Sequence, residues 1–357
     1  MKRRILALLL CVVMALGGTY LVGAAPVYAE GEGESEITDL GTATVYMTGY
    51  GYKGTNVRDG VTVVSLEGKL ADEEAVPEDD TDEFSVTGIS APGVLPQSGI
   101  SFAEDRVTFE PVKAGTCIVV FDVGEQAFKV KVNCYKPVMS ASQLMYKKQK
   151  KTLTVTGIPA GTAVKYASSN PKVATVSANG VVTAKVSGNT VIYATVGTVK
   201  LGCVVSVATK KKYRAINRAV KMGRTCRYSQ PKRMRKGYYD CSSMVWRSYK
   251  PEKIYIGSKW FAPVAASQAK YLARKKKIYC KLSYANGQNM RYRAGDLLFK
   301  TGAKNRRYKG IYHVEMFRGY TFLGYTQQNR PVVTTRWANR LDGYADDSWD
   351  PGIMGRP

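Results

Sequence analysis

Histidine is nearly absent from this sequence: His313 is the single histidine among 357 residues. A metal site built on several imidazoles is therefore excluded, because such a site needs more than one histidine ligand. A mechanism that uses a histidine as general base must also use this one residue.

Acidic residues are scarce in the second part of the chain. Residues 138–357 contain 8 aspartates and glutamates against 42 lysines and arginines, whereas residues 30–137 contain 20 acidic and 8 basic residues. The net charge of the whole chain is +25. A basic domain of this kind ordinarily suggests a polyanionic partner such as nucleic acid, bound through the release of counterions.

Long apolar runs are lacking except at the N-terminus. Basic residues at positions 2–4 precede a run that ends with small residues at Ala29. This pattern is typical of a secretory signal peptide, and we predict one at residues 1–29. The alternative is a membrane anchor, since residues 5–25 could just span a bilayer, but glycines interrupt the run and favour cleavage. We expect a protein that is secreted or associated with the cell wall, with no stable membrane anchor after cleavage.

Export decides how the basic charge is interpreted. A Gram-positive cell wall is itself a polyanion of phosphates and carboxylates, and a cationic domain binds it by the same release of counterions. We therefore expect anionic cell-wall polymers as partners, and no nucleic acid.

Short runs of alternating apolar and polar residues, separated by Gly, Asn and Pro, extend from about residue 40 to 208. Such spacing predicts all-β sandwiches. The segment that begins at Val107 is repeated at Val182, which predicts two modules of similar plan at residues 30–137 and 138–208. The aligned glycines are Gly115 with Gly188 and Gly124 with Gly197.

The second module contains the run SSNPKVATVSANGVVTAKVSGNTVIYA. This run closely resembles the bacterial Ig-like group 2 domain, a module of surface and wall proteins, and the first module resembles it more weakly. The resemblance implies a role in spacing or adhesion rather than catalysis.

The pattern changes near Lys210, where helical spacing begins and a separate domain of catalytic size, residues 209–357, is expected. Within it, Cys241 precedes an apolar stretch spaced for one face of a helix. A helix N-terminus stabilises a thiolate. The negative charge of the adjacent Asp240 disfavours a thiolate at Cys241, unless the carboxylate caps the helix or faces the substrate. From spacing alone, an inert cysteine in a core helix remains an equal alternative.

Two further segments favour the reactive cysteine. RAGDLLF at 293–299 predicts a turn that leads into a strand, and IYHVEMF at 311–317 predicts a second strand that carries His313 and, on the same face, Glu315. A cysteine at a helix N-terminus followed by a strand histidine fits a Cys/His nucleophilic hydrolase.

The runs YDCSSMVWRSYK, RAGDLLF and HVEMFRG resemble the NlpC-type papain-like cell-wall peptidases in order and spacing. The resemblance implies an α+β papain-like fold, with Cys241 as nucleophile and His313 as general base. It implies hydrolysis of an amide of the peptidoglycan stem peptide, in many members the γ-D-glutamyl to diamino-acid bond. Papain-like chemistry needs neither a metal nor an organic cofactor, so none is implied. Asp240 and Ser242 match positions beside the substrate amine, and Tyr228 resembles the family tyrosine near the cleft.

The chain departs from that family at the third catalytic residue. The family often has a histidine about 12 residues after the catalytic one, where this chain has Tyr325. We predict Gln327 as the substitute, because an amide can also orient an imidazole. Other candidates are Asn329, Asn339 and Glu315, although Glu315 would have to reach sideways along its strand.

The predicted fold class is therefore multidomain, with two all-β Ig-like sandwiches followed by an α+β papain-like cysteine peptidase domain. Two alternative functions stay open: a non-catalytic wall-binding or adhesion protein with a degenerate papain-like domain, and an amidase of the related CHAP type. No disulfide is assigned to the six cysteines that follow residue 29, because their spacing is wide and irregular.

Overall fold

The computed structural model describes residues 36–47, 62–70, 84–103, 105–303, 305–326, 328, 330–338 and 351–357. These form two compact units that meet in sequence between residues 136 and 137. The predicted signal peptide lies outside the described residues. Among the helices of the described part, none is both long and apolar enough to cross a membrane.

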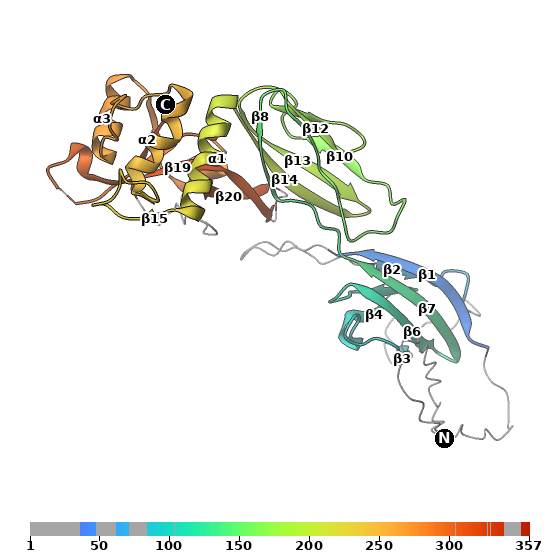
Figure 1. The fold of residues 1–357 in the computed structure, drawn as a ribbon. Helices are drawn as coiled ribbons and strands as arrows, with labels where there is room; N and C mark the ends of the chain where they lie inside the picture. The colour runs from blue at the N-terminus through green and yellow to red at the C-terminus, as the bar shows by residue number, and fades with distance from the viewer. Residues whose placement is uncertain are drawn as a thin grey trace, which may run out of the picture. The chain divides into compact units, whose positions relative to one another are not determined.

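The first unit is a β module built from two sheets (Figure 1). Its elements are β1 (Thr38–Tyr46), β2 (Thr62–Ser65), β3 (Phe84–Ile89), the 3-10 helix η2 (Gln97–Gly99), β4 (Ile100–Ala103), β5 (Arg106–Phe109), β6 (Gly115–Val123) and β7 (Gln126–Tyr135). The sheet orders are β1-β7-β6-β3 and β2-β5-β4, with β1 parallel to β7. Alternate residues of β6 and β7, such as Phe121 and Val130, are buried in one core together with Val107 of β5.

The second unit begins, from residue 137, with another β module. Its strands are β8 (Ser142–Tyr146), β9 (Lys150–Thr152), β10 (Lys165–Ser168), β11 (Ala174–Val176), β12 (Val181–Ala184), β13 (Gly188–Val196) and β14 (Val199–Ala208). The sheet orders are β8-β14-β13-β10 and β11-β12-β9, with β8 parallel to β14.

The two modules therefore have the same topology, strand for strand, which confirms the similar plan that the internal repeat predicts. In both repeats the long hairpin turns at a glycine with positive φ, +60° at Gly124 and +55° at Gly197. Such a backbone conformation favours glycine because side chains with a Cβ rarely adopt it.

The remaining elements form an α+β arrangement. The helices are α1 (Lys210–Thr225), α2 (Cys241–Tyr249), η3 (Lys250–Glu252), α3 (Ala265–Arg274), α4 (Tyr284–Gln288) and η4 (Tyr308–Gly310). The strands are β15 (Arg227–Tyr228), β16 (Tyr238–Tyr239), β17 (Ile278–Lys281), β18 (Leu297–Thr301), β19 (Ile311–Tyr325), β20 (Pro331–Trp337) and β21 (Gly352–Gly355). An antiparallel sheet of order β17-β21-β18-β19-β20 is its centre.

This sheet is covered on both faces. Residues of α1, α2 and α3 share one core with Leu297, Phe299 and Val314 of the sheet. Leu298, between two of these, belongs instead to a second core with Phe322 of the sheet and residues of β13 and β14. Because successive strand residues point to opposite faces, the helices cover one face and the second β module covers the other. The second module and the sheet thus form one compact unit.

The contact between Gly202 of β14 and Phe322 tests this shared core. A Cβ placed on Gly202 would lie 2.6 Å from the Phe322 ring. Overpacking of this kind costs roughly 1–3 kcal/mol, so we expect Gly202→Ala to lower the free energy of unfolding by about that amount in urea titrations. In a Phe322→Ala background the ring is gone, and the same change should cost little. Equal costs in both backgrounds would contradict the packing described here.

Candidate functional site

Cys241 is the first residue of α2, as the sequence predicts. Asp240 is the N-cap, and its Oδ1 accepts a hydrogen bond of 2.7 Å from the backbone N–H of Ser243. The Ser243 hydroxyl accepts in return from the backbone N–H of Asp240, at 2.9 Å. This capping box fixes the start of the helix, so the thiol lies where unpaired N–H groups and the helix dipole favour a thiolate. Cys241 itself is buried.

The structure places His313 of β19 close enough to Cys241 for each side chain to shift the pKa of the other. Burial raises the pKa of the Cys241 thiol, but the hydrogen bond and charge of His313, together with the backbone of Val314, outweigh it and lower the pKa below its ordinary value. Burial lowers the pKa of His313, yet its hydrogen bonds to Cys241 and Glu315 raise that pKa to about 9. The two shifts favour a thiolate beside an imidazolium.

Glu315 is the third polar group of this cluster. Its Oε1 lies 3.4 Å from Nε2 of His313 and 3.8 Å from Nζ of Lys300. The side chain of Glu315 is only 1% exposed, which limits screening of its charge by water. Glu315 and His313 share one face of β19, as strand alternation predicts.

The other candidates for the third residue, Gln327, Asn329 and Asn339, lie outside the described residues. Our choice of Gln327 therefore stays a prediction. Glu315 is the candidate whose contact with the imidazole the structure describes.

Tyr228 and Ser242 also lie at the start of α2. Burial first, and then the charge of the neighbouring Cys241, raise the pKa of the Tyr228 phenol. Its ring packs edge-on against Tyr239 with centroids 5.6 Å apart, and half of the residue is exposed. The Ser242 hydroxyl donates to Asp240 Oδ1 at 3.2 Å.

Sequence reasoning missed Arg233, because a run of basic residues ordinarily indicates a solvated face. Arg233 Nε lies 3.1 Å from Asp240 Oδ2, and its Nη2 donates to the Ser242 hydroxyl at 3.0 Å. The guanidinium thus opposes the negative charge of Asp240, which raises the pKa of Cys241. Nothing in the sequence run 232–236 distinguishes Arg233 from its basic neighbours.

The Gly-Asp turn of RAGDLLF has a structural role rather than a place in this cluster. Asp296 is fully buried and pairs with Arg356 at 2.8 Å and with Lys212 at 3.7 Å. It also accepts hydrogen bonds of 2.8 Å from the Tyr279 hydroxyl and from the backbone N–H of Arg293. Asp296 directly precedes β18, Lys212 lies in α1 and Arg356 follows β21. The contacts of Asp296 therefore fix α1 and the end of β21 against β18.

The other thiols contrast with Cys241. All six cysteines in the described part of the chain are free. Burial raises the pKa of Cys134 to about 11 and of Cys203 to about 12, and it also raises the pKa of Cys280. The described residues contain no group of three or more His, Cys, Asp or Glu side chains arranged to hold a metal ion.

Comparison with known families identifies the second β module. Residues 137–207 match the family model of the bacterial Ig-like domain, group 2. This segment is a bacterial Ig-like domain. No curated protein matches the chain.

Several solved structures are similar to parts of this chain. Domains 4 and 5 of the S-layer protein SbsC share 24% identity over 36% of this chain and 78% of theirs, with a TM-score of 0.19. Invasin, a bacterial integrin-binding protein, shares 14% over 35% of this chain and 31% of its own, with a TM-score of 0.27. A C-terminal intimin fragment in complex with the intimin-binding domain of its translocated receptor shares 14% over 86% and 96%, with a TM-score of 0.29. These scores are too low to support an argument about function.

The lowered pKa of Cys241 predicts fast alkylation at neutral pH, because the thiolate is the reactive form. We expect its rate with iodoacetamide to reach half of its plateau at a lower pH than the rate of an ordinary thiol does. His313→Ala should move this midpoint upward, because burial then raises the pKa of Cys241 without the opposing effect of His313. Mass spectrometry of each labelled cysteine gives the rates, with Cys280 as the internal control. A Cys241 that reacts no faster than Cys280 at pH 7 would refute the thiolate.

The single histidine allows a direct test of Glu315. NMR of the His313 ring should give a pKa near 9, and Glu315→Gln should lower it, because an amide stabilises the imidazolium less. Since the folded-state pKa is raised, protonated His313 stabilises the protein fully below pH 6.5, and this contribution is lost as the pH rises through about 9. Glu252→Gln, a matched change at another buried carboxylate, should leave the titration unchanged. An equal shift in both variants would rule out a specific contact.

Proposed function

We propose that residues 209–357 form a papain-like α+β cysteine hydrolase of the NlpC type, which cleaves an amide bond of the peptidoglycan stem peptide. The observation that carries this proposal is the contact of Cys241, at a helix N-terminus, with His313, which in turn faces the buried Glu315. The geometry supports nucleophilic catalysis, and the substrate class rests on the resemblance of the three sequence motifs.

The mechanism follows from the roles of these groups. The Cys241 thiolate attacks the carbonyl carbon of the amide, and the protonated His313 then donates its proton to the leaving amine nitrogen. The resulting thioester is hydrolysed by water, from which His313 removes a proton; the acid product is released, and the Cys241 thiolate is regenerated beside the protonated His313. Glu315 holds the imidazole and stabilises its charged form, which a carboxylate does better than an amide.

The placement of the substrate is also part of the proposal. Tyr228, Asp240 and Ser242 lie beside Cys241, where the family resemblance expects the substrate amine. Arg233 already neutralises Asp240, so we expect a weaker preference for a free amine than an unpaired carboxylate would give. Export by the signal peptide and retention by anionic wall polymers complete this proposal.

A second candidate function is wall binding or adhesion without catalysis. The bacterial Ig-like domain at 137–207 favours this candidate more than the catalytic one. An amidase of the CHAP type is a variant of the first proposal that uses the same cysteine on a different bond.

The test is incubation of muropeptides that carry meso-diaminopimelate or lysine with the chain from residue 30 onward. We expect new peptide products from the wild type and from Cys280→Ala, a matched change at another thiol, and none from Cys241→Ala. Product masses measured by mass spectrometry identify the bond and separate a peptidase from a CHAP-type amidase. Intact muropeptides after incubation with the folded wild type would contradict catalysis and favour the wall-binding candidate.

A further inference from the structure

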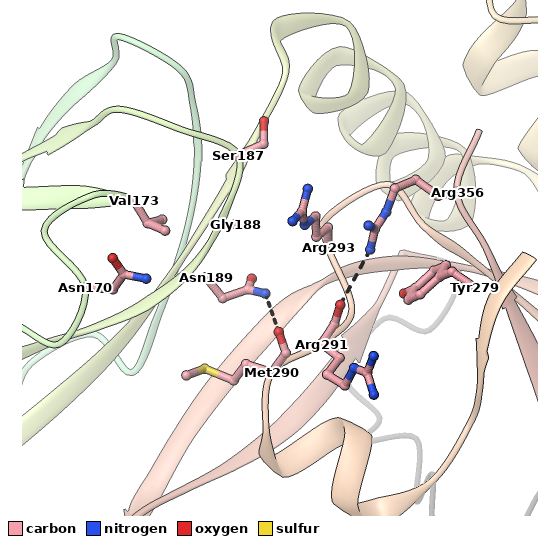
Figure 2. Close-up of a pocket in the computed structure, with 10 residues that line it drawn as sticks. All are labelled: Asn170, Val173, Ser187, Gly188, Asn189, Tyr279, Met290, Arg291, Arg293 and Arg356. Carbon is pink, nitrogen blue, oxygen red and sulfur yellow. Dashed lines mark hydrogen bonds between the residues drawn. The ribbon is translucent and has the colours of Figure 1, made fainter. Parts of the chain in front are cut away.

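A basic pocket lies where the bacterial Ig-like domain meets the C-terminal sheet (Figure 2). Its volume is about 390 Å³. One side is formed by the Ig-like domain through Asn170, Ser187 and Asn189, and the other side carries Arg291, Arg293 and Arg356. Asn189 joins the two sides, because its Nδ2 donates to the carbonyls of Met290 at 3.0 Å and Tyr292 at 2.7 Å.

The three arginines differ in whether their positive charge is paired with a carboxylate. Arg356 pairs with the buried Asp296 at 2.8 Å and lies over the Tyr279 ring, with its guanidinium carbon 4.2 Å from the centroid. Arg291 donates to the neutral amide oxygen of Asn286 at 3.2 Å. Among the described residues, no carboxylate pairs with either Arg291 or Arg293.

No acidic residue is among the described residues that line the pocket. Asp296, beneath it, is shared between Arg356 and Lys212, so its single negative charge is already compensated. Among the described residues, no carboxylate therefore balances the positive charge of Arg291 and Arg293, and the hydrogen bonds of Asn189 and Asp296 fix the backbone at this side of the pocket.

We propose that this pocket binds a phosphate group. Guanidinium groups present planar forks that match oxyanions, and the several oxygens of a phosphate group can accept hydrogen bonds from more than one fork at once. The volume exceeds that of a phosphate ion, so there is room for part of the molecule to which the phosphate is esterified. The source is either free phosphate or a phosphodiester polymer, and the site is independent of Cys241.

The test measures binding to the chain from residue 30 onward by calorimetry at 0.15 M salt, where nonspecific surface attraction is largely screened. Inorganic phosphate, poly(glycerol phosphate) and polyglutamate are the probes. The variant Arg291→Gln with Arg293→Gln removes the uncompensated charge and leaves Arg356 in place for Asp296. Its matched control, Lys211→Gln with Lys221→Gln, removes the same charge from the exposed face of α1.

We expect the pocket variant to weaken phosphate binding roughly tenfold or more, the loss of at least one charge-assisted contact, and the control variant to bind as the wild type does. Tighter binding of poly(glycerol phosphate) than of inorganic phosphate identifies a polymer source, and the reverse identifies free phosphate. Equal weakening in both variants, preference for polyglutamate, or no phosphate binding by the wild type would each overturn the proposal.

A second variant covers the case in which the arginine changes disturb folding. Ser187→Glu introduces a carboxylate from the opposite side of the pocket, where it can pair with the guanidinium groups of Arg291 and Arg293. We expect it to abolish phosphate binding and to raise the melting temperature. Unchanged phosphate binding by this variant would place the phosphate elsewhere. The alkylation rate of Cys241 should not change in any of these variants, which separates this site from the proposed catalytic one.

Discussion

Each of the four carboxylates that the structure describes beyond residue 137 is buried and faces at least one cation. Asp240 pairs with Arg233, Glu252 with Arg214 and Arg218, Asp296 with Lys212 and Arg356, and Glu315 with Lys300 and His313. A buried charge without a partner costs several kcal/mol, so these pairs constrain which elements can meet. Glu252, for example, fixes α1 against the end of α2, and the two arginines hold its pKa at about 2.

The candidate site depends on the same constraint. Asp240 caps α2, and its charge raises the pKa of the adjacent Cys241; Arg233, 3.1 Å from that carboxylate, opposes this effect with its positive charge. Glu315 acts in the opposite sense, because its charge favours an imidazolium at His313, which in turn favours the thiolate. With all four carboxylates committed in this way, none in the described part of this unit is left for Arg291 and Arg293. The scarcity of acids that the sequence displays thus reappears, within the described residues, as a pocket whose arginines Arg291 and Arg293 have no carboxylate partner.

Local patterns predicted local structure well. The capping residue and apolar spacing around Cys241 placed a helix start, and the repeat at Val107 and Val182 predicted two modules of one plan. Long-range pairing was less accessible. Arg233 belongs to a basic run in which nothing marks one residue as buried. The contact of Glu315 with His313 is local: alternation predicts that the two share a face of β19, but not that Glu315 Oε1 comes within 3.4 Å of the imidazole. The aromatic residues of β19 predict an ordinary core strand, but in the structure they pack against the Ig-like domain.

β19 is the element that couples the candidate site to the Ig-like domain (Figure 1). Its first residues carry His313 and Glu315, while Phe317, Tyr320 and Phe322 further along share a core with Val191 and Val204 of the Ig-like strands. A strand with both faces covered is stiff, because moving it would break close packing on each side. The Ig-like domain is therefore held in a fixed relation to the thiol, and so is the basic pocket, which lies between this domain and the C-terminal sheet.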